Sequence, residues 1–133
     1  MISPCINFQG NANEAISFYE TVFNGTGKQV MKYSDLPPDS NHPVSHGMED
    51  WILHGRLTIF GTLFCFSDSQ EPAQPGTMFS FSVWCKTPEE AADIYHRLAD
   101  SGEILMKLAP QHFARAYAWV RDRFGISWQL ICE

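Results

Sequence analysis

The sequence predicts an α+β fold made of two β-α-β-β-β units, and two observations carry this prediction. The first is a pair of amphipathic helical patterns, "NANEAISFYETVFNG" and "KTPEEAADIYHRLADSG", which repeat the same plan. The second is that each pattern follows one short apolar strand and precedes three more strands. A single unit would leave one face of its sheet open, so the two units are expected to share a sheet or pack together.

The helices are expected near residues 11–24 and 88–101. The first has apolar residues at helical spacing, and Asn11 or Asn13 is its predicted N-cap. The second follows Thr87, a residue type that accepts a hydrogen bond from the first turn of a helix. Both patterns therefore read as helices of about three turns.

Strand patterns fill the rest of both repeats, and a proline-rich loop interrupts the first. We expect a single domain, residues 1–133, made of two repeats at about 1–70 and 77–133. The strands are expected at 2–8, 28–33, 51–60, 62–68, 78–85, 103–108, 116–122 and 126–132.

The composition limits the classes of partner. The chain has 133 residues, 44% of them apolar, and a formal net charge of −6. No cluster of lysine and arginine is present, so nucleic acid is not an expected partner. No run approaches the ~18 apolar residues that cross a membrane, and a cytoplasmic location is expected. The four cysteines have no CxxC spacing and are expected to be free, mostly buried thiols.

Four stretches in this order carry a family resemblance: the opening "FQGNANEAISFY", the helix "EAISFYETVF", the strand pair "LHGRLTIFGTLFCFSD" and the ending "AYAWVRDRFGISWQL". Together they resemble the PhnB-like branch of the vicinal-oxygen-chelate superfamily, which has the glyoxalase and bleomycin-resistance fold. The resemblance covers almost the whole chain. It implies mixed sheets that form a cup-shaped cavity with the helices outside, a small-molecule ligand, and a homodimer.

The same resemblance bears on metal binding. Metal-dependent members of the superfamily take ligands from the first and last strands of each unit, and the corresponding positions here are Pro4, Cys65, Met78 or Ser80, and Gln129. These side chains are poor ligands for a divalent ion, apart from the single thiol. No metal site and no cofactor are therefore expected. Some members are labelled methyltransferases, but this chain has no glycine-rich turn between a strand and a helix to bind a nucleotide-like cofactor.

Strand alternation selects candidate cavity residues. In "WILHGRLTIFG" it puts His54, Arg56 and Thr58 on one face and the leucines on the other. His54 is a candidate base or ligand anchor and Arg56 a candidate anion clamp, although a hydrogen-bonded histidine in an interface or a partly wet cavity is favoured. His42 and His46 lie in the proline-rich loop and are not favoured as a metal site. The predicted cavity residues are His54, Arg56, Cys65, Gln129, Phe8, Trp84, Tyr117 and Trp119.

Two functions of different classes fit these residues. The first is a metal-free protein that binds a small, partly apolar molecule in an aromatic-walled cup. The alternative is an enzyme with lyase, isomerase or transferase chemistry that uses His54 and Arg56, or a non-standard metal site such as His54 with Cys65. The missing ligand set favours binding. The fold alone does not decide, since one architecture hosts both functions.

Overall fold

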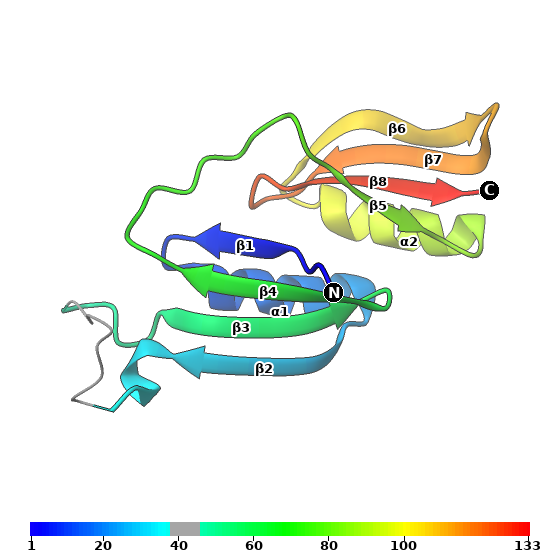
Figure 1. Cartoon of the computed structure of the whole chain (residues 1–133). Coiled ribbons are helices and arrows are strands. Elements are labelled where there is room, and N and C mark those ends of the chain that lie inside the picture. The colour runs from blue at the N-terminus through cyan, green and yellow to red at the C-terminus, as the bar shows by residue number, and fades with distance from the viewer. Residues whose placement is uncertain (38–45) are drawn as a thin grey trace. The chain divides into compact units, whose positions relative to one another are not determined.

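The computed structural model describes residues 1–37 and 46–133 and has the predicted α+β fold. The chain divides into two compact units, Met1–Ala73 and Gln74–Glu133. Each unit has the element order β-α-β-β-β, with one four-stranded mixed sheet and one long helix (Figure 1). The repeat seen in the sequence is therefore a repeat of the fold.

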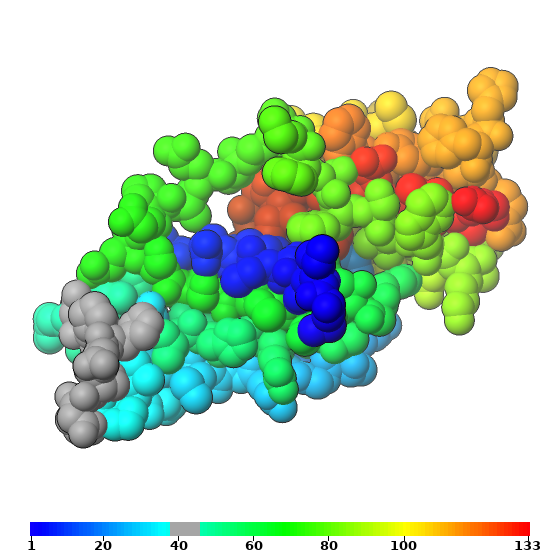
Figure 2. All heavy atoms as spheres, in the orientation of Figure 1, coloured from blue at the N-terminus to red at the C-terminus, as the bar shows by residue number. Residues whose placement is uncertain are grey.

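The first unit contains β1 (Cys5–Phe8), α1 (Ala12–Phe23), β2 (Thr26–Lys32), the short 3-10 helix η1 (Tyr33–Asp35), β3 (Ile52–Ile59) and β4 (Thr62–Asp68). Its strands lie in the order β1-β4-β3-β2, with β1 parallel to β4 and the other pairs antiparallel. The first residues of the chain, dark blue in Figure 2, are at the surface of this unit, and Met1 and Ile2 are fully exposed. Helix α1 covers one face of the sheet, which leaves the other face open within the unit.

The second unit repeats this arrangement with β5 (Phe81–Trp84), α2 (Pro88–Ala99), β6 (Glu103–Gln111), β7 (Ala114–Arg121) and β8 (Ser127–Cys132). The strand order is β5-β8-β7-β6, and β5 runs parallel to β8. All predicted strands and both helices are confirmed, with ends that differ from the prediction by at most three residues. The largest differences are at β1 and β5, which begin later, and at β6, which ends later.

The core of the first unit lies between α1 and its sheet. Tyr19 of α1 is fully buried, and its ring stacks on Phe66 of β4 at 6.1 Å between centroids. Gly55 of β3 gives α1 room, because a Cβ there would lie 2.7 Å from Ile16 Cδ1. Phe8 stacks on the same Phe66 ring and is only 5% exposed. The prediction that Phe8 lines the open face was wrong, since the alternation of the short β1 strand turns it toward the helix.

The core of the second unit is built in the same way. Trp128 and Leu130 of β8 and Val120 of β7 are almost fully buried, as are Ile94 and Leu98 of α2. The indole nitrogen Nε1 of Trp128 donates to the buried carboxylate of Asp122 at 2.8 Å, and the same carboxylate accepts from the backbone N–H groups that follow it. A large aromatic residue is thus buried without leaving a polar atom unpaired.

The two helices begin by different means. Thr87 Oγ1 accepts from the backbone N–H of Glu90 at 3.1 Å, which confirms the predicted cap of α2. Asn11 stands at the N-cap of α1, but its side chain makes no capping bond. Instead, Oδ1 of Asp68 accepts from the N–H groups of Gly10 at 2.8 Å and Ala12 at 3.0 Å. The first helix is therefore capped from the end of β4.

No helix in residues 1–37 and 46–133 is long and apolar enough to span a membrane.

Candidate functional site

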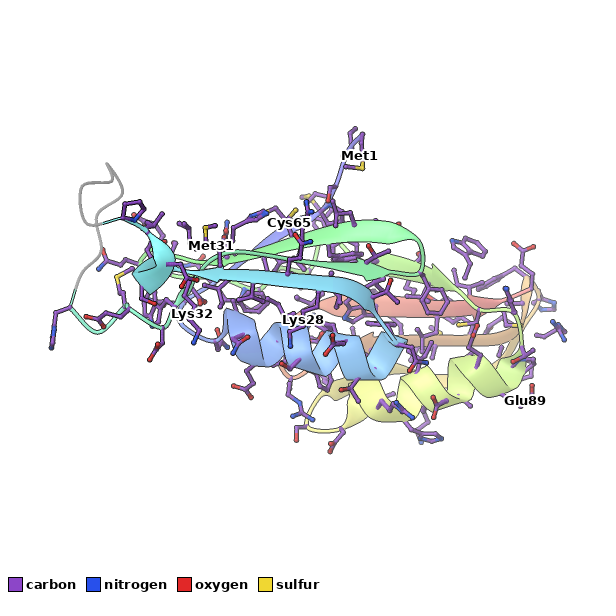
Figure 3. All side chains as sticks on the ribbon, turned by 90° about the horizontal axis from the view of Figure 1, so that it is seen from below. Met1, Lys28, Met31, Lys32, Cys65 and Glu89 are labelled. Carbon is purple, nitrogen blue, oxygen red and sulfur yellow. The ribbon has the colours of Figure 1, made fainter. Side chains whose placement is uncertain are left out.

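The open face of the first unit is polar, and it holds three of the predicted cavity residues. His54 and Arg56 of β3 are exposed on this face, whereas Leu57 is fully buried, as strand alternation predicts. Cys65 of β4 is half-buried and is the direct cross-strand partner of Arg56. Figure 3 labels Cys65 and Met31 on the side of the sheet turned away from α1.

Arg56 is held across this face by a neighbouring strand. Its Nε donates to Oε1 of Gln29 on β2 at 2.9 Å, and the two residues are paired in the strand register. Among the described residues the other guanidinium nitrogens have no hydrogen-bond partner, so they can donate to a group of opposite charge. Sequence reasoning did not single out Gln29, although its place on the strand before β3 made it a possible neighbour.

His54 is exposed, and no described side chain orients its ring through a hydrogen bond. Its register partner on β2 is Met31, a thioether that does not fix an imidazole tautomer. Among the residues that the structure describes, no side chain forms a hydrogen bond with the His54 ring.

The open face of the second unit centres on a hydrogen-bond chain. The hydroxyl of Tyr117 on β7 donates to Oε1 of Gln129 on β8 at 2.6 Å. Gln129 Nε2 in turn lies 2.7 Å from Oγ of Ser80, to which it donates. Both ends of the Gln129 amide are therefore engaged, and its orientation is fixed. Burial also raises the pKa of Tyr117 above its ordinary value, so the phenol stays a donor at neutral pH.

Aromatic side chains surround this chain of hydrogen bonds. Trp119 is the register partner of Gln129 and packs against the buried cluster of Ala114, Tyr117 and Ile131. Its indole nitrogen Nε1 is buried, yet it has no hydrogen-bond partner within residues 1–37 and 46–133. Trp84 on β5 is paired with Ile131 and is 58% exposed. This face offers apolar area and buried donors, the Nε1 of Trp119 and the Nε of Arg121, that no described residue accepts from.

The predicted cavity residues thus fall into two groups, one in each unit. His54, Arg56 and Cys65 share the open face of the first unit. Trp84, Tyr117, Trp119 and Gln129 share the open face of the second. Phe8 belongs to neither group, because it lies in the core of the first unit. Ser80 was considered only as a metal-ligand position, and its bond to Gln129 gives it a different contact.

Few strong metal donors stand at the positions that the family resemblance assigns to metal ligands. No group of three or more histidine, cysteine, aspartate or glutamate side chains is placed to hold a metal ion within the described parts of the chain. The carbonyl oxygen of Pro4 accepts from the backbone N–H of Cys65, and the Gln129 amide is already engaged. His46 lies near Glu49 at 3.8 Å, and His42, the other loop histidine, lies outside the described residues.

Comparison with known proteins agrees with this geometry. Residues 1–131 match the family described as 3-demethylubiquinone-9 3-methyltransferase. The chain belongs to this family, the PhnB-like branch of the vicinal-oxygen-chelate superfamily. Protein PA1353 from Pseudomonas aeruginosa is 30% identical with a TM-score of 0.84, over 100% of this chain and 97% of that one. A PhnB protein from Bacillus cereus, titled a putative 3-demethylubiquinone-9 3-methyltransferase, is 31% identical with a TM-score of 0.80, over 99% and 98% of the two chains.

A more distant likeness concerns the fold alone. FosX, a fosfomycin resistance protein from Listeria monocytogenes, is 12% identical with a TM-score of 0.67, over 100% of this chain and 92% of that one. One FosX variant was crystallised with Mn(II) and a dihydroxypropylphosphonic acid. The PhnB-like chain described here therefore shares its fold with a protein of which one variant was crystallised with a metal and a small molecule.

Proposed function

We propose that this PhnB-like protein binds a small, partly apolar molecule and that its two units act as one domain without the superfamily's divalent metal. The observation that carries the proposal is the indole nitrogen of Trp119, which is buried and unpaired among the described residues. A buried donor without an acceptor costs roughly 1–3 kcal/mol, and a ligand oxygen or nitrogen that accepts this hydrogen bond would remove the cost.

The surroundings of Trp119 specify the ligand further. Tyr117 and Ile131 pack beside the indole ring, and Trp84 exposes more than half of its surface. Gln129 and the Tyr117 hydroxyl bond to each other, so they present a fixed polar edge rather than mobile groups. The face suits a compact molecule with one flat apolar side and at least one acceptor.

The first unit adds a possible contact of another kind. Arg56 is exposed, and its Nε bond to Gln29 holds the guanidinium across the sheet. Such a group suits an anionic ligand group. The alternative enzymatic reading gains no support from this face, since His54 lacks a hydrogen-bonded group to orient it among the described residues. Binding is therefore the function that these contacts favour.

Native mass spectrometry tests the proposal. The protein purified under mild conditions is expected to carry an additional mass of a small molecule that disappears on denaturation. Trp119→Phe keeps an aromatic ring but removes the donor, and it should lower the occupied fraction, with an affinity loss of about 2–10-fold. Trp51→Phe is the matched control, because Trp51 lies against Gly10 in the first unit, and it should keep the ligand. Equal loss in both variants would contradict a role for the Trp119 donor.

A further inference from the structure

All four cysteines of the chain occupy repeated places in the fold. In each unit, one cysteine belongs to the first strand or follows it directly, and the other belongs to the last strand. Cys5 on β1 is the register partner of Cys65 on β4. Cys85 and Cys132 lie one residue beyond the last register pair of β5 and β8. The four thiols are thus two cross-strand pairs.

The thiols of the first pair point to the same side of their sheet. Phe8 and Phe66 stack on the α1 side, so the alternate residues of β1 and β4 point away from the helix. The hydrogen bond from Ser67 Oγ to Asn7 Oδ1, 2.6 Å long, confirms that these alternate positions share the open face. Cys5 and Cys65 are each two residues from this bonded pair and therefore lie on the open face as well.

Solvent reaches this pair, and one thiol affects the pKa of the other. Cys5 is exposed and Cys65 is half-buried. Burial, and after it the neighbouring Cys65, raise the pKa of Cys5. Ser3 Oγ lies 3.8 Å from Cys65 Sγ on the outer side. The pair is therefore an accessible dithiol rather than two unrelated cysteines.

The spacing between the two strands limits what can bridge such a pair of thiols. Neighbouring strands lie about 4.7–4.9 Å apart, so in-register thiols with like rotamers stand roughly that far from each other. Two metal–thiolate bonds of about 2.3 Å in line span about 4.6 Å, so a bridging ion fits two thiols at this spacing. A disulfide also accepts this spacing, because its Cα atoms can lie about 4.4–6.8 Å apart, and the experiment below distinguishes the two.

Charge also favours a bridging ion. Two thiolates around a monovalent cation leave one net negative charge at the site. Arg56 is the register partner of Cys65 on its other side and carries one positive charge. The guanidinium therefore offsets the net charge of a site that holds two thiolates and one monovalent ion.

We propose that Cys5 and Cys65 form a two-coordinate site for one soft, thiophilic metal ion of the Cu(I) type. Thiolates select such ions, and an ion that accepts two ligands in line does not need the larger donor set that a divalent ion requires. On binding, each thiol loses its proton to solvent and both sulfurs bond to the ion, so two protons are released per ion with no change in oxidation state. The site is independent of the small-molecule ligand proposed above.

The second cysteine pair provides a control within the same chain. Cys85 and Cys132 are buried on the α2 side of their sheet. Burial raises the pKa of Cys85 to about 12, with the Glu90 carboxylate as the next cause. Arg115 Nη2 already donates to Cys132 Sγ at 3.4 Å. This pair has equivalent strand positions but is buried, and Cys85 resists deprotonation, so the pair should not compete for the ion.

The test is an anaerobic titration of the reduced full chain with Cu(I) in the presence of bicinchoninate, which reports free Cu(I) by its colour. The wild type is expected to withhold one equivalent of Cu(I) per chain from bicinchoninate. Its affinity for Cu(I) should be higher at higher pH, because binding releases two protons. Cys5→Ser and Cys65→Ser should each lose this equivalent, and Cys85→Ser should keep it. Circular dichroism of each variant verifies that the fold is retained.

Three results would overturn the proposal. The first is that the Cys5→Ser/Cys65→Ser double variant still binds one equivalent of Cu(I). That result would assign the ion to Met31, His54 or another group. The second is no equivalent withheld by the wild type. The third is a mass decrease of two hydrogens without bound copper, which would make the pair a disulfide instead. X-ray absorption at the copper edge should show two sulfur neighbours in the wild type.

Discussion

The hydroxyl of Tyr117 on β7 donates to Gln129 Oε1 on β8 at 2.6 Å, and this bond fixes the orientation of the Gln129 side chain. The amide nitrogen of Gln129 then donates to Ser80 Oγ at 2.7 Å. These two hydrogen bonds thus join β7 and β8 to Ser80, in the segment before β5. A glutamine at this position is part of a neutral hydrogen-bond network, and its polar atoms are satisfied without a metal.

Tyr117→Phe should destabilise the second unit by removing this bond. Tyr117 is 8% exposed, so the loss leaves Gln129 Oε1 poorly solvated. We expect the free energy of unfolding to fall by about 0.5–1.5 kcal/mol, measured by urea denaturation. Tyr95→Phe is the control: Tyr95 is equally buried, and its hydroxyl forms no hydrogen bond with the described residues. Similar losses in the two variants would show that the bond contributes nothing.

Asp68→Asn should lower the free energy of unfolding by more than Tyr117→Phe does. Its carboxylate is 2% exposed and accepts from three backbone N–H groups, those of Gly10, Ala12 and Ile52. An amide can accept at only one of the two oxygen positions, and its NH₂ group faces donors at the other. We expect a loss of about 2–4 kcal/mol in the free energy of unfolding. Asp50→Asn, at a side chain that is 91% exposed, should change stability little. A loss below that of Tyr117→Phe would contradict the capping role of Asp68.

The two helix starts show which parts of the fold can be predicted from sequence. Thr87 caps α2 through a residue three positions away, so a local pattern contains the whole interaction. The cap of α1 comes from Asp68, which is distant in sequence, and no local pattern reports it. The repeat and the strand alternation were predictable because they depend on periodicity, whereas the pairing of a helix end with a remote carboxylate depends on strand order.

The candidate site also has features that the sequence predicts and features that it cannot predict. The exposure of His54 and Arg56 followed from alternation along a long strand. Phe8 was assigned to the wrong face because β1 has only four residues and gives little periodicity to read. The Tyr117–Gln129 bond and the unpaired Trp119 nitrogen could not be predicted, since both depend on the register between β7 and β8.

Thiol ionisation should make stability depend on pH. Burial raises the pKa of Cys85 from 9.0 to about 12, so the folded chain holds this proton after the unfolded chain has lost it. The free energy of unfolding should therefore fall as pH rises from about 9 toward 12, with the full contribution present below pH 9. Between pH 8 and 10.5, Cys85→Ser should lose less stability than the wild type, by about 2 kcal/mol. Parallel pH dependences would show that Cys85 does not titrate in this range.

Reactivity toward a thiol reagent should separate the two cysteine pairs. Cys5 is exposed and Cys65 half-buried, whereas Cys85 and Cys132 are buried. At pH 8, the folded protein should react with up to two equivalents of iodoacetamide and the guanidinium-unfolded protein with four. Peptide mass spectrometry should locate the early label on Cys5 or Cys65. Early labelling of Cys85 would contradict its burial.

We expect a homodimer in solution. Each unit leaves one sheet face uncovered by its own helix, and apolar residues such as Trp84 and Met106 are exposed on the second unit. Association would bury such surface, and exposed apolar area of this kind favours contact between copies. Multi-angle light scattering at micromolar concentration should give about twice the chain mass. A mass equal to one chain under these conditions would rule the dimer out.

The purified protein should hold no stoichiometric divalent metal at the superfamily positions. A site for Zn²⁺, Ni²⁺ or Mn²⁺ needs three or four strong donors at about 2.0–2.3 Å. Pro4 has no side-chain donor, Gln129 is engaged with Tyr117 and Ser80, and Cys65 alone does not complete a coordination shell.

Elemental analysis after exhaustive dialysis is the measurement, and less than about 0.1 divalent ion per chain is expected. Gln129→Glu should not create a site, because one carboxylate and one thiol supply only two of the three or four strong donors that a divalent ion needs. Ser82→Ala, at the register partner of Gln129, serves as a neutral control. About one metal per chain in the wild type, lost together in Cys65→Ser and His54→Ala, would contradict the metal-free proposal and favour the enzymatic alternative, since only a site that recruits the exposed His54 to the adjacent strand could hold such an ion.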